Sequence, residues 1–257
     1  MTVPSVSLAS GGQMPLLGFG TWQLPGSEAY DPVRVALDTG YRHLDTATMY
    51  RNESEVGRAL RDSGAPRDQV FVTTKLPAEL AGEERRTVEA SLRALGVDQL
   101  DLWLVHWPPH GGARPDTWRE FVAAQRDGLT RAIGVSNYSI AQIDELIDAT
   151  GQAPAVNQIP YSPALHDSKL LAQHRERGVV VEGYSPFRRS NLREPVFTEV
   201  AEAHGVAPAQ VILRWHLQHE IVVIPKSATA ERIKSNFDIL GFELTADEMA
   251  RIDALGG

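Results

Sequence analysis

Short apolar runs alternate with segments of helical period along most of the chain. Each run is rich in valine, isoleucine and leucine and ends in polar residues. Strands that are buried on both faces show continuous apolar runs of this kind. We therefore predict eight strands, at residues 16–20, 42–45, 70–75, 100–106, 132–136, 155–158, 179–184 and 222–226.

The segments between these strands carry recognisable helix ends. Asp31 and Pro32 predict a helix start ahead of Val33, and Gly40 follows as a stop. Residues 245–248, Thr-Ala-Asp-Glu, predict a capping box ahead of a final helix. Eight strand–helix units of roughly 30 residues each match a (β/α)8 barrel of about 250 residues.

The N-terminal stretch has a different pattern. Residues 6–16 are apolar on both sides of Gly11 and Gly12, which predicts a two-stranded hairpin. No linker rich in proline, glycine and serine divides the chain. We therefore expect one α/β domain over residues 1–257, a (β/α)8 TIM barrel with an N-terminal β-hairpin.

Composition and charge exclude several classes of function. The 257 residues include 33 acidic and 25 basic side chains, a formal charge of −8, and no basic cluster to meet a nucleic acid. The absence of cysteine excludes disulfides, thiolate metal sites and cysteine nucleophiles. No signal-peptide pattern and no membrane-length apolar run is present. We expect a cytoplasmic monomer with no membrane or nucleic-acid partner.

Polar side chains at three successive strand ends suggest chemistry, because functional groups gather at the carboxyl ends of barrel strands. These are Asp45, Lys75 and His106, and Tyr50 follows one short loop after Asp45. Each alone is explained equally well as a turn, surface or packing residue. Together, a lysine paired with aspartate stays protonated and lowers the pKa of a tyrosine below its usual value of about 10. We expect a tyrosine acid that protonates a carbonyl oxygen near neutral pH.

With these residues the sequence resembles the aldo-keto reductase superfamily over nearly its whole length. Within it, the chain is most similar to the bacterial group that includes 2,5-diketo-D-gluconate reductases. The matching motifs are LGFGTW at 17–22, GYRHLDTATMY at 40–50, TTKL at 73–76, LDLWLVHWP at 100–108, GVSNY at 134–138, NQIPYSP at 157–163, GYSP at 183–186, and IPKS and RIKSN within 224–236.

The resemblance implies NADPH-dependent reduction of aldehydes and ketones to alcohols. Tyr50 would be the general acid and base, Lys75 and Asp45 would tune its pKa, and His106 would orient the carbonyl. NADPH would lie extended across the barrel mouth. The implied cofactor-binding residues are Thr21, Trp22, Ser136, Asn137, Gln158, Tyr184, Ser185, Lys226, Ser227, Arg232 and Asn236.

Within that set, the resemblance implies that Ser136, Asn137 and Gln158 hold the carboxamide and that Tyr184 stacks on the nicotinamide. Lys226, Ser227 and Arg232 would bind the 2′-phosphate, with Asn236 at the adenine.

Spacing independently supports an anion site in this last segment. Thr229 is a candidate N-cap, and Arg232 and Asn236 lie four residues apart on one helix face. A solvated cationic face is the alternative interpretation. Ser235 stands where many relatives carry Glu or Gln, which predicts weaker cofactor binding.

Two other patterns carry little weight. Gly18 and Gly20 faintly suggest a dinucleotide fingerprint, but the third glycine and the following helix are missing. His106 and His110 have the spacing of zinc ligands on a helix, but the prolines between them forbid that helix. We expect His216 and His219 to be surface residues on an outer helix, and we expect no metal site.

The substrate is less defined than the reaction. Trp22, Trp107 and Phe187 are expected to line an aromatic substrate pocket, although rim packing explains them equally well. The chain stops soon after its final helix and the loop from Pro108 to Asp116 is short, so we expect an open, shallow site. Two functional alternatives stay open: a nucleotide-binding sensor with little turnover, as in potassium-channel β subunits, and a metal-dependent barrel hydrolase.

Overall fold

A computed structural model describes residues 3–256, so Met1, Thr2 and Gly257 of the expected domain lie outside the described residues. The chain begins with an antiparallel hairpin of β1 (Ser5–Ser7) and β2 (Gln13–Pro15), in which Val6 pairs with Met14. Gly11 and Gly12, in the connecting turn, both have positive φ, a conformation that glycine adopts without steric cost. The predicted hairpin is confirmed.

Eight parallel strands follow, each hydrogen-bonded to the next, as the sequence pattern predicts. Backbone bonds from the Gly18 amide to the Val223 carbonyl (2.9 Å) and from the Val223 amide to the Leu16 carbonyl (2.8 Å) join the first strand to the last. The sheet therefore closes into a barrel. Its strands are β3 (Phe19–Gly20), β4 (His43–Asp45), β5 (Phe71–Leu76), β6 (Leu100–Val105), β7 (Thr130–Ser136), β8 (Val156–Pro160), β9 (Val180–Tyr184) and β10 (Val222–Val223).

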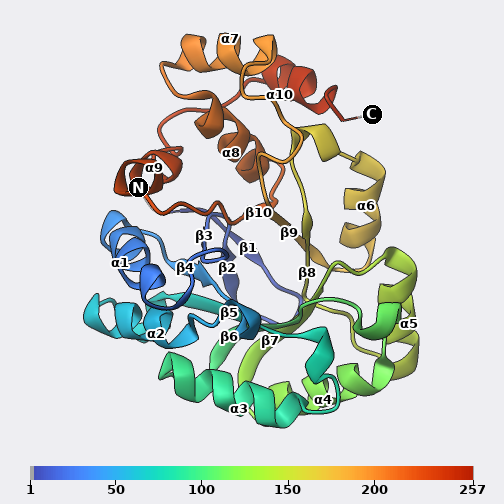
Figure 1. Ribbon diagram of the computed structural model, residues 1–257. Helices are drawn as coiled ribbons and strands as arrows, with labels where there is room; N and C mark the ends of the chain where they lie inside the picture. The colour runs from blue at the N-terminus through green and yellow to red at the C-terminus, as the bar shows by residue number, and fades with distance from the viewer. Residues whose placement is uncertain (1–2, 257) are drawn as a thin grey trace.

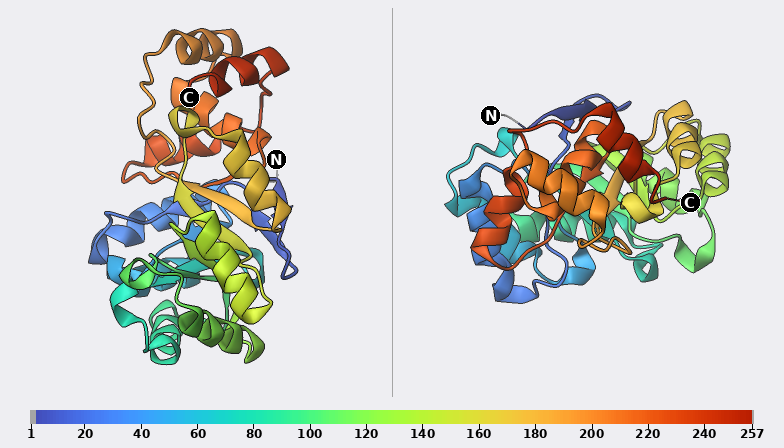
Figure 2. Two further views of the ribbon diagram at one scale, coloured as in Figure 1. Left: turned by 90° about the vertical axis from the view of Figure 1, so that its right-hand side faces the viewer. Right: turned by 90° about the horizontal axis from the view of Figure 1, so that it is seen from above.

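Helices surround these strands in an α/β, (β/α)8 arrangement (Figures 1 and 2). The α-helices are α1 (Tyr30–Thr39), α2 (Glu53–Asp62), α3 (Glu84–Leu95), α4 (Pro115–Arg126), α5 (Ile140–Thr150), α6 (Ser168–Glu176), α7 (Pro195–His204), α8 (Pro208–Gln218), α9 (Ala230–Phe237) and α10 (Ala246–Asp253). Short 3-10 turns join them to the strands: η1 (Gly26–Ala29), η2 (Thr48–Tyr50), η3 (Arg67–Gln69), η4 (Ala78–Leu80), η5 (Pro109–Gly111) and η6 (Pro163–Leu165). Within residues 3–256 every helix is too short or too polar to cross a bilayer.

The predicted start of the last helix, α10, is confirmed, whereas the predicted start of the first helix, α1, is not. The capping box of Thr245 and Glu248 is present at the start of α10. α1, however, begins at Tyr30 with Ala29 as its N-cap, so the predicted cap at Asp31 is wrong. The reason is that η1 runs directly into α1 and places Asp31 inside the first turn.

The strands are buried on both faces, as the continuous apolar runs predict. Aromatic rings fill much of the space between sheet and helices. Trp103 of β6 stacks on Phe121 of α4 with ring centroids 3.7 Å apart, and Tyr161 stacks on Trp215 of α8 at 6.0 Å. Such packing fixes the strand ends from which the functional side chains project.

The expectation that His216 lies at the surface is wrong. Its side chain is fully buried between α8 and the segment after β8, where Nδ1 lies 2.7 Å from the Ile212 carbonyl. Burial lowers the pKa of His216 to about 4, so the imidazole is neutral at physiological pH. His219, three residues later, is partly exposed, as expected.

Candidate active site

The parallel strands bring Asp45, Lys75 and His106 to one mouth of the barrel. Asp45 ends β4, Lys75 lies near the end of β5, and His106 directly follows β6, with its amide bonded to the Leu76 carbonyl at 2.9 Å. The short turn η2 then carries Tyr50 back to the same mouth. The structure thus brings together the three side chains that the sequence places at successive strand ends and the tyrosine that follows the first of them.

The core of this group is a buried ion pair. Nζ of Lys75 donates to Asp45 Oδ1 at 2.7 Å, to Oδ2 at 2.8 Å and to the Thr46 carbonyl at 2.8 Å. Burial by itself would lower the pKa of Lys75, but the surrounding acidic groups, above all the Asp45 carboxylate, together outweigh burial and raise that pKa above its ordinary value. Lys75 therefore stays an ammonium in the barrel interior.

Tyr50 lies above this ion pair. The Lys75 Nζ atom is 5.1 Å from the centroid of the Tyr50 ring, and the His106 ring meets it edge to face at 5.6 Å. Burial raises the pKa of Tyr50 above its usual value, and Lys75 only partly offsets that effect. The predicted lowering of this pKa is therefore wrong for the structure as it stands, because desolvation of the phenol outweighs the nearby ammonium.

His106 is neutral at physiological pH. Burial, with a smaller contribution from Lys75, lowers the pKa of His106 to about 3. Its Nδ1 atom is buried and has no hydrogen-bond partner among residues 3–256. A buried polar atom without a partner is uncommon in folded proteins and often marks a strained or functional group.

Further polar side chains connect these strand ends into one network. Gln158 Nε2 donates to Asp45 Oδ2 at 2.8 Å, and the Ser136 hydroxyl donates to the Gln158 carbonyl at 2.8 Å. Asn137 Nδ2 donates to Ser136 Oγ at 2.9 Å, while Asn137 Oδ1 accepts from the Tyr184 hydroxyl at 2.8 Å. The expected carboxamide- and ring-binding residues are thus adjacent to one another and to the ion pair.

Thr21 and Ser185 complete the expected cofactor-facing set near the mouth. The Thr21 hydroxyl donates to the Asp45 carbonyl at 3.0 Å and is fully buried, so it braces the strand end. Ser185 follows β9 and has a positive φ of 54°, a backbone conformation that costs free energy outside glycine.

Large apolar side chains stand at the surface beside these residues. Trp22 is 55% exposed, Trp107 49% and Met49 51%. Trp22 follows Thr21 in the chain, Trp107 follows His106, and Met49 precedes Tyr50. Phe187 is partly buried against the core. Met49 was not identified from the sequence, although its place beside Tyr50 is a usable signal.

The segment after β10 has the chemistry of an anion site. Thr229 is the N-cap of α9, as predicted, and its side chain makes no capping bond to the helix. Among residues 3–256 no carboxylate pairs with Lys226 or Arg232. Ser227, the neighbour of Lys226 in the chain, and Asn236, four residues after Arg232 on α9, are both buried. Unpaired cations at a helix start suit a phosphate, so the donor set fits the phosphate of NADPH.

Glu182 is a buried residue that the sequence reasoning missed. It lies on β9 inside the barrel, fully buried, with its Oε1 atom 3.6 Å from Nε2 of His43 and neither oxygen hydrogen-bonded within the described chain. Burial and the Asp45 charge raise the pKa of Glu182 to about 8. A glutamate inside the apolar run Val179–Tyr184 was the signal available.

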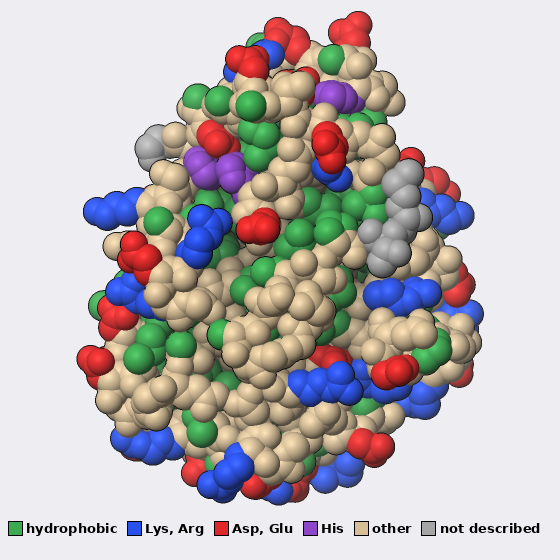
Figure 3. Space-filling model, turned by 180° about the vertical axis from the view of Figure 1, so that it is seen from behind, with side chains coloured by type: hydrophobic (Ala, Val, Ile, Leu, Met, Phe, Trp, Pro, Cys, Tyr) green, Lys and Arg blue, Asp and Glu red, His purple; other side chains and the backbone are tan. Residues whose placement is uncertain are grey.

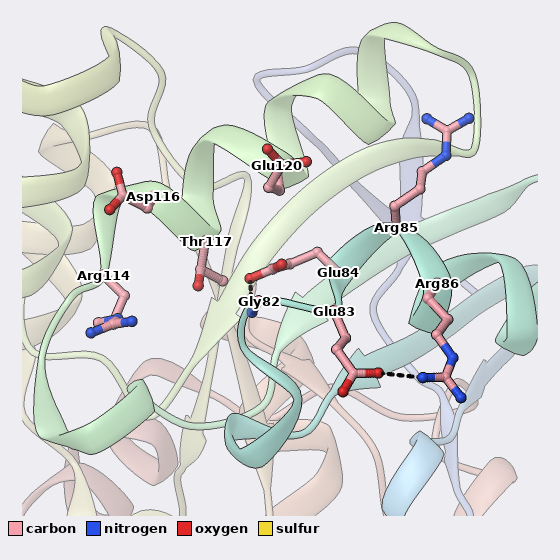
Figure 4. A pocket seen from close by; sticks show the side chains of 9 residues that line it. All are labelled: Gly82, Glu83, Glu84, Arg85, Arg86, Arg114, Asp116, Thr117 and Glu120. Carbon is pink, nitrogen blue, oxygen red and sulfur yellow. Dashed lines mark hydrogen bonds and ion pairs between the residues drawn. The ribbon is translucent and has the colours of Figure 1, made fainter.

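A cavity of about 570 Å³ lies away from these residues, between the starts of α3 and α4 (Figure 4). Its lining is charged, and some of the charges are already satisfied: Glu83 pairs with Arg86 at 2.9 Å, and Glu84 accepts from the Gly82 amide at 2.8 Å. Binding sites for small organic molecules are mostly apolar, so this groove is a poor candidate for a carbonyl substrate.

Comparisons with known proteins agree with the geometry. The model of the Aldo/keto reductase family matches residues 16–256. A 2,5-diketo-D-gluconic acid reductase B from Corynebacterium sp. (strain SHS752001) is 44% identical over 260 residues, which cover 99% of this chain and 93% of that protein.

Solved structures of other aldo/keto reductases resemble this chain over almost the whole length of both proteins. An aldo/keto reductase from Brucella melitensis shares 40% identity with a TM-score of 0.95 and covers 99% of this chain and 100% of its own. A Bombyx mori aldo-keto reductase, solved in complex with NADP, shares 30% identity with a TM-score of 0.92 over 100% and 94% of the two chains.

Proposed function

The chain belongs to the aldo/keto reductase family, and we propose that it reduces aldehydes and ketones to alcohols with NADPH, using Tyr50 as the proton donor. The observation that carries this proposal is the buried Lys75–Asp45 ion pair with the Tyr50 ring 5.1 Å from the ammonium. It supplies a proton donor beside a fixed positive charge at the mouth of the barrel.

NADPH is the cofactor we assign. The Bombyx mori relative was solved with NADP, and neither Lys226, which precedes α9, nor Arg232, in its first turn, has an acidic partner in the described chain. When bound, NADPH supplies the hydride that reduces the carbonyl carbon. Lys226, Ser227 and Arg232 would hold the 2′-phosphate, and Asn236 would lie at the adenine.

The nicotinamide end would be held at the strand ends. Ser136, Asn137 and Gln158 would hold the carboxamide, and Tyr184 would pack against the ring. Hydrogen bonds join the side chains of Ser136, Asn137 and Tyr184 to one another, and the Gln158 side chain is held by Asp45, so their polar atoms are oriented before any ligand arrives. Thr21, Trp22 and Ser185 complete the proposed cofactor-binding set.

Tyr50 fits the role of acid better than His106. The pKa of His106 is lowered to about 3, so its imidazole carries no extra proton to give near neutral pH. The pKa of Tyr50 is raised, so its hydroxyl keeps its proton until the developing oxyanion takes it. The Lys75 ammonium then stabilises the tyrosinate, and Asp45 holds Lys75 in place.

His106 would orient the substrate. A neutral imidazole donates one hydrogen bond, and at this position it can direct that bond to the carbonyl oxygen. Trp22, Trp107 and Phe187 would contact the rest of the substrate from the apolar rim.

The proposal is tested by mixing the purified protein with NADPH and a panel of aldehydes, diketones and sugars, and following absorbance at ~340 nm. We expect substrate-dependent loss of NADPH together with formation of the alcohol. Tight NADPH binding in a fluorescence titration, without turnover on any substrate, would instead identify a sensor. Turnover lost only on chelation would identify a metal-dependent enzyme.

We also propose that one chain is sufficient for activity, because all of these residues belong to one barrel. Light scattering of the active fraction should therefore give the mass of a monomer, 28.2 kDa. A cytoplasmic location stays a prediction from the sequence.

A further inference from the structure

Two histidines and an aspartate, none of them assigned to carbonyl reduction, meet on the outer side of the barrel. His166 follows η6, His219 follows α8, and Asp253 is the last residue of α10. Their ligand atoms all lie within 4.8 Å of one another. Histidine side chains adjoin one another at the molecular surface on the face shown in Figure 3.

The carboxylate of Asp253 is the centre of this cluster. Its Oδ1 atom lies 2.8 Å from His219 Nε2 and 3.9 Å from His166 Nε2. Among residues 3–256 no lysine or arginine pairs with Asp253. The negative charge is therefore available to a cation that comes from solution.

Two buried aromatic residues form hydrogen bonds with these candidate ligands and fix their orientation. The Trp215 indole N–H donates to Asp253 Oδ1 at 2.7 Å, and the Tyr161 hydroxyl lies 3.0 Å from His166 Nδ1. With Nδ1 of His166 engaged, its Nε2 atom is left for a metal. Partners of this kind, which orient metal ligands from a second layer, are typical of protein metal sites.

The geometry is close to that of a zinc site. Zinc takes histidine nitrogens and carboxylate oxygens at about 2.0–2.2 Å in tetrahedral arrangement, which puts neighbouring ligand atoms roughly 3.3 Å apart. The observed distances of 2.8 and 3.9 Å lie on either side of that value. The three side chains are 10%, 21% and 31% exposed, so small rotations at a solvent-accessible surface would close them around an ion.

We propose that His166, His219 and Asp253 bind a divalent transition-metal ion, with Zn²⁺ the best match and water completing the coordination. Imidazole and carboxylate without thiolate suit zinc and its neighbours in the first transition row. The ion would join η6, α8 and α10, so its role would be structural and separate from the proposed hydride transfer. The sequence does not predict this site, because its three ligands are spread over nearly 90 residues without a motif spacing.

The test uses the full chain without a histidine tag, stripped with chelator and titrated with ZnCl₂ by calorimetry. We expect one Zn²⁺ per chain and a higher melting temperature with the metal. Substitutions His219→Gln and Asp253→Asn should each weaken Zn²⁺ binding at least about tenfold. Circular dichroism checks that both variants fold, and His166→Gln provides a third variant if one of them does not.

A matched control lies on the same side of the molecule. His204 pairs with Glu248 at 3.0 Å, a histidine–carboxylate pair whose side chains are 20% and 13% exposed and which belongs to no three-residue cluster in the described chain. His204→Gln should leave Zn²⁺ binding unchanged. Absence of stoichiometric binding in the parent protein, or equal binding in the cluster variants, would overturn the proposal and leave the cluster as a hydrogen-bond network.

Discussion

At the scale of a single residue, the buried carboxyl of Glu182 predicts how folding stability depends on pH. The pKa of this buried group is about 8, above its ordinary 4.5, so between these values the folded chain holds a proton that the unfolded chain loses. Folding stability then falls as pH rises through this window. Buried His43 and His106 have the opposite effect on folding stability, because burial lowers their pKa to about 3. Their effect is confined to pH values below about 6.5, where histidines of the unfolded chain take up protons.

We therefore expect the free energy of unfolding to decrease between about pH 6.5 and 8. Glu182→Gln keeps the shape of the side chain without its titration and should flatten this decrease. Urea unfolding of both proteins at the two pH values measures the effect. An equal decrease in the variant would show that Glu182 is already ionised in the folded chain.

Individual residues show which features of the site can be predicted from the sequence and which cannot. Asp45, Lys75 and His106 were found from their places at strand ends, because strand polarity alone decides which ends share a mouth. The direction of the Tyr50 pKa shift was not found, since it depends on the balance between burial and charge. Glu182 was missed because its place in an apolar run marks it as unusual but does not show whether its side chain faces water or the barrel interior.

At the scale of elements, α9 should distinguish NADPH from NADH. Arg232→Ala removes an exposed guanidinium that has no carboxylate partner in the described chain, so the fold should be unaffected. A charge-assisted hydrogen bond contributes about 1.5–3 kcal/mol, so NADPH affinity should fall at least about tenfold. Affinity for NADH should change little. Fluorescence titration measures both.

Lys234→Ala is the control, because Lys234 is exposed on the same helix but was not assigned to the phosphate. It should leave both affinities nearly unchanged. Equal losses of NADPH and NADH affinity in Arg232→Ala would show that the arginine does not contact the 2′-phosphate.

The contact between α2 and α3 predicts an effect on stability. A Cβ at Gly57 of α2 would lie 2.1 Å from the carbonyl oxygen of Leu95, the last residue of α3. Gly57→Ala should therefore destabilise the fold by about 1–3 kcal/mol through overpacking. Helix propensity alone predicts the opposite, a gain of about 1 kcal/mol.

Chemical denaturation gives the sign of the effect. Ser54→Ala, at an exposed position of the same helix, should be nearly neutral. A Gly57→Ala variant as stable as the parent would show that α2 and α3 separate at no cost.

The elements themselves were largely predictable, and the exceptions have identifiable causes. Buried parallel strands give β-branched runs that are visible without knowledge of the fold. The first and last strands, β3 and β10, are only two residues long in the structure, because a bridge at Leu17 and loop bonds replace part of the predicted ladders. His216 was placed at the surface because the polarity of one side chain does not reveal which face of α8 packs inward.

At the scale of the whole molecule, the mouth of the barrel predicts broad substrate tolerance. The connection from β6 to α4 is short, and Trp22, Met49 and Trp107 are about half exposed at the rim. Little of a substrate would be buried, so remote binding energy contributes little to the transition state. We expect KM values on the order of a millimolar or above for a range of aldehydes.

Steady-state kinetics on aldehydes of increasing size measures this tolerance. A single bulky substrate with micromolar KM, and rejection of the others, would contradict the open site. Mass measurement alongside the assay checks that no second chain supplies a wall of the pocket.

The most direct measurement of the proposed reaction is kcat for Tyr50→Phe together with NADPH affinity. This substitution removes only the hydroxyl, and a proton donor contributes about 10²–10⁴ in rate. We predict a loss of kcat in that range with NADPH affinity changed by no more than a few-fold. A variant that keeps most of its kcat would show that the proton comes from another group.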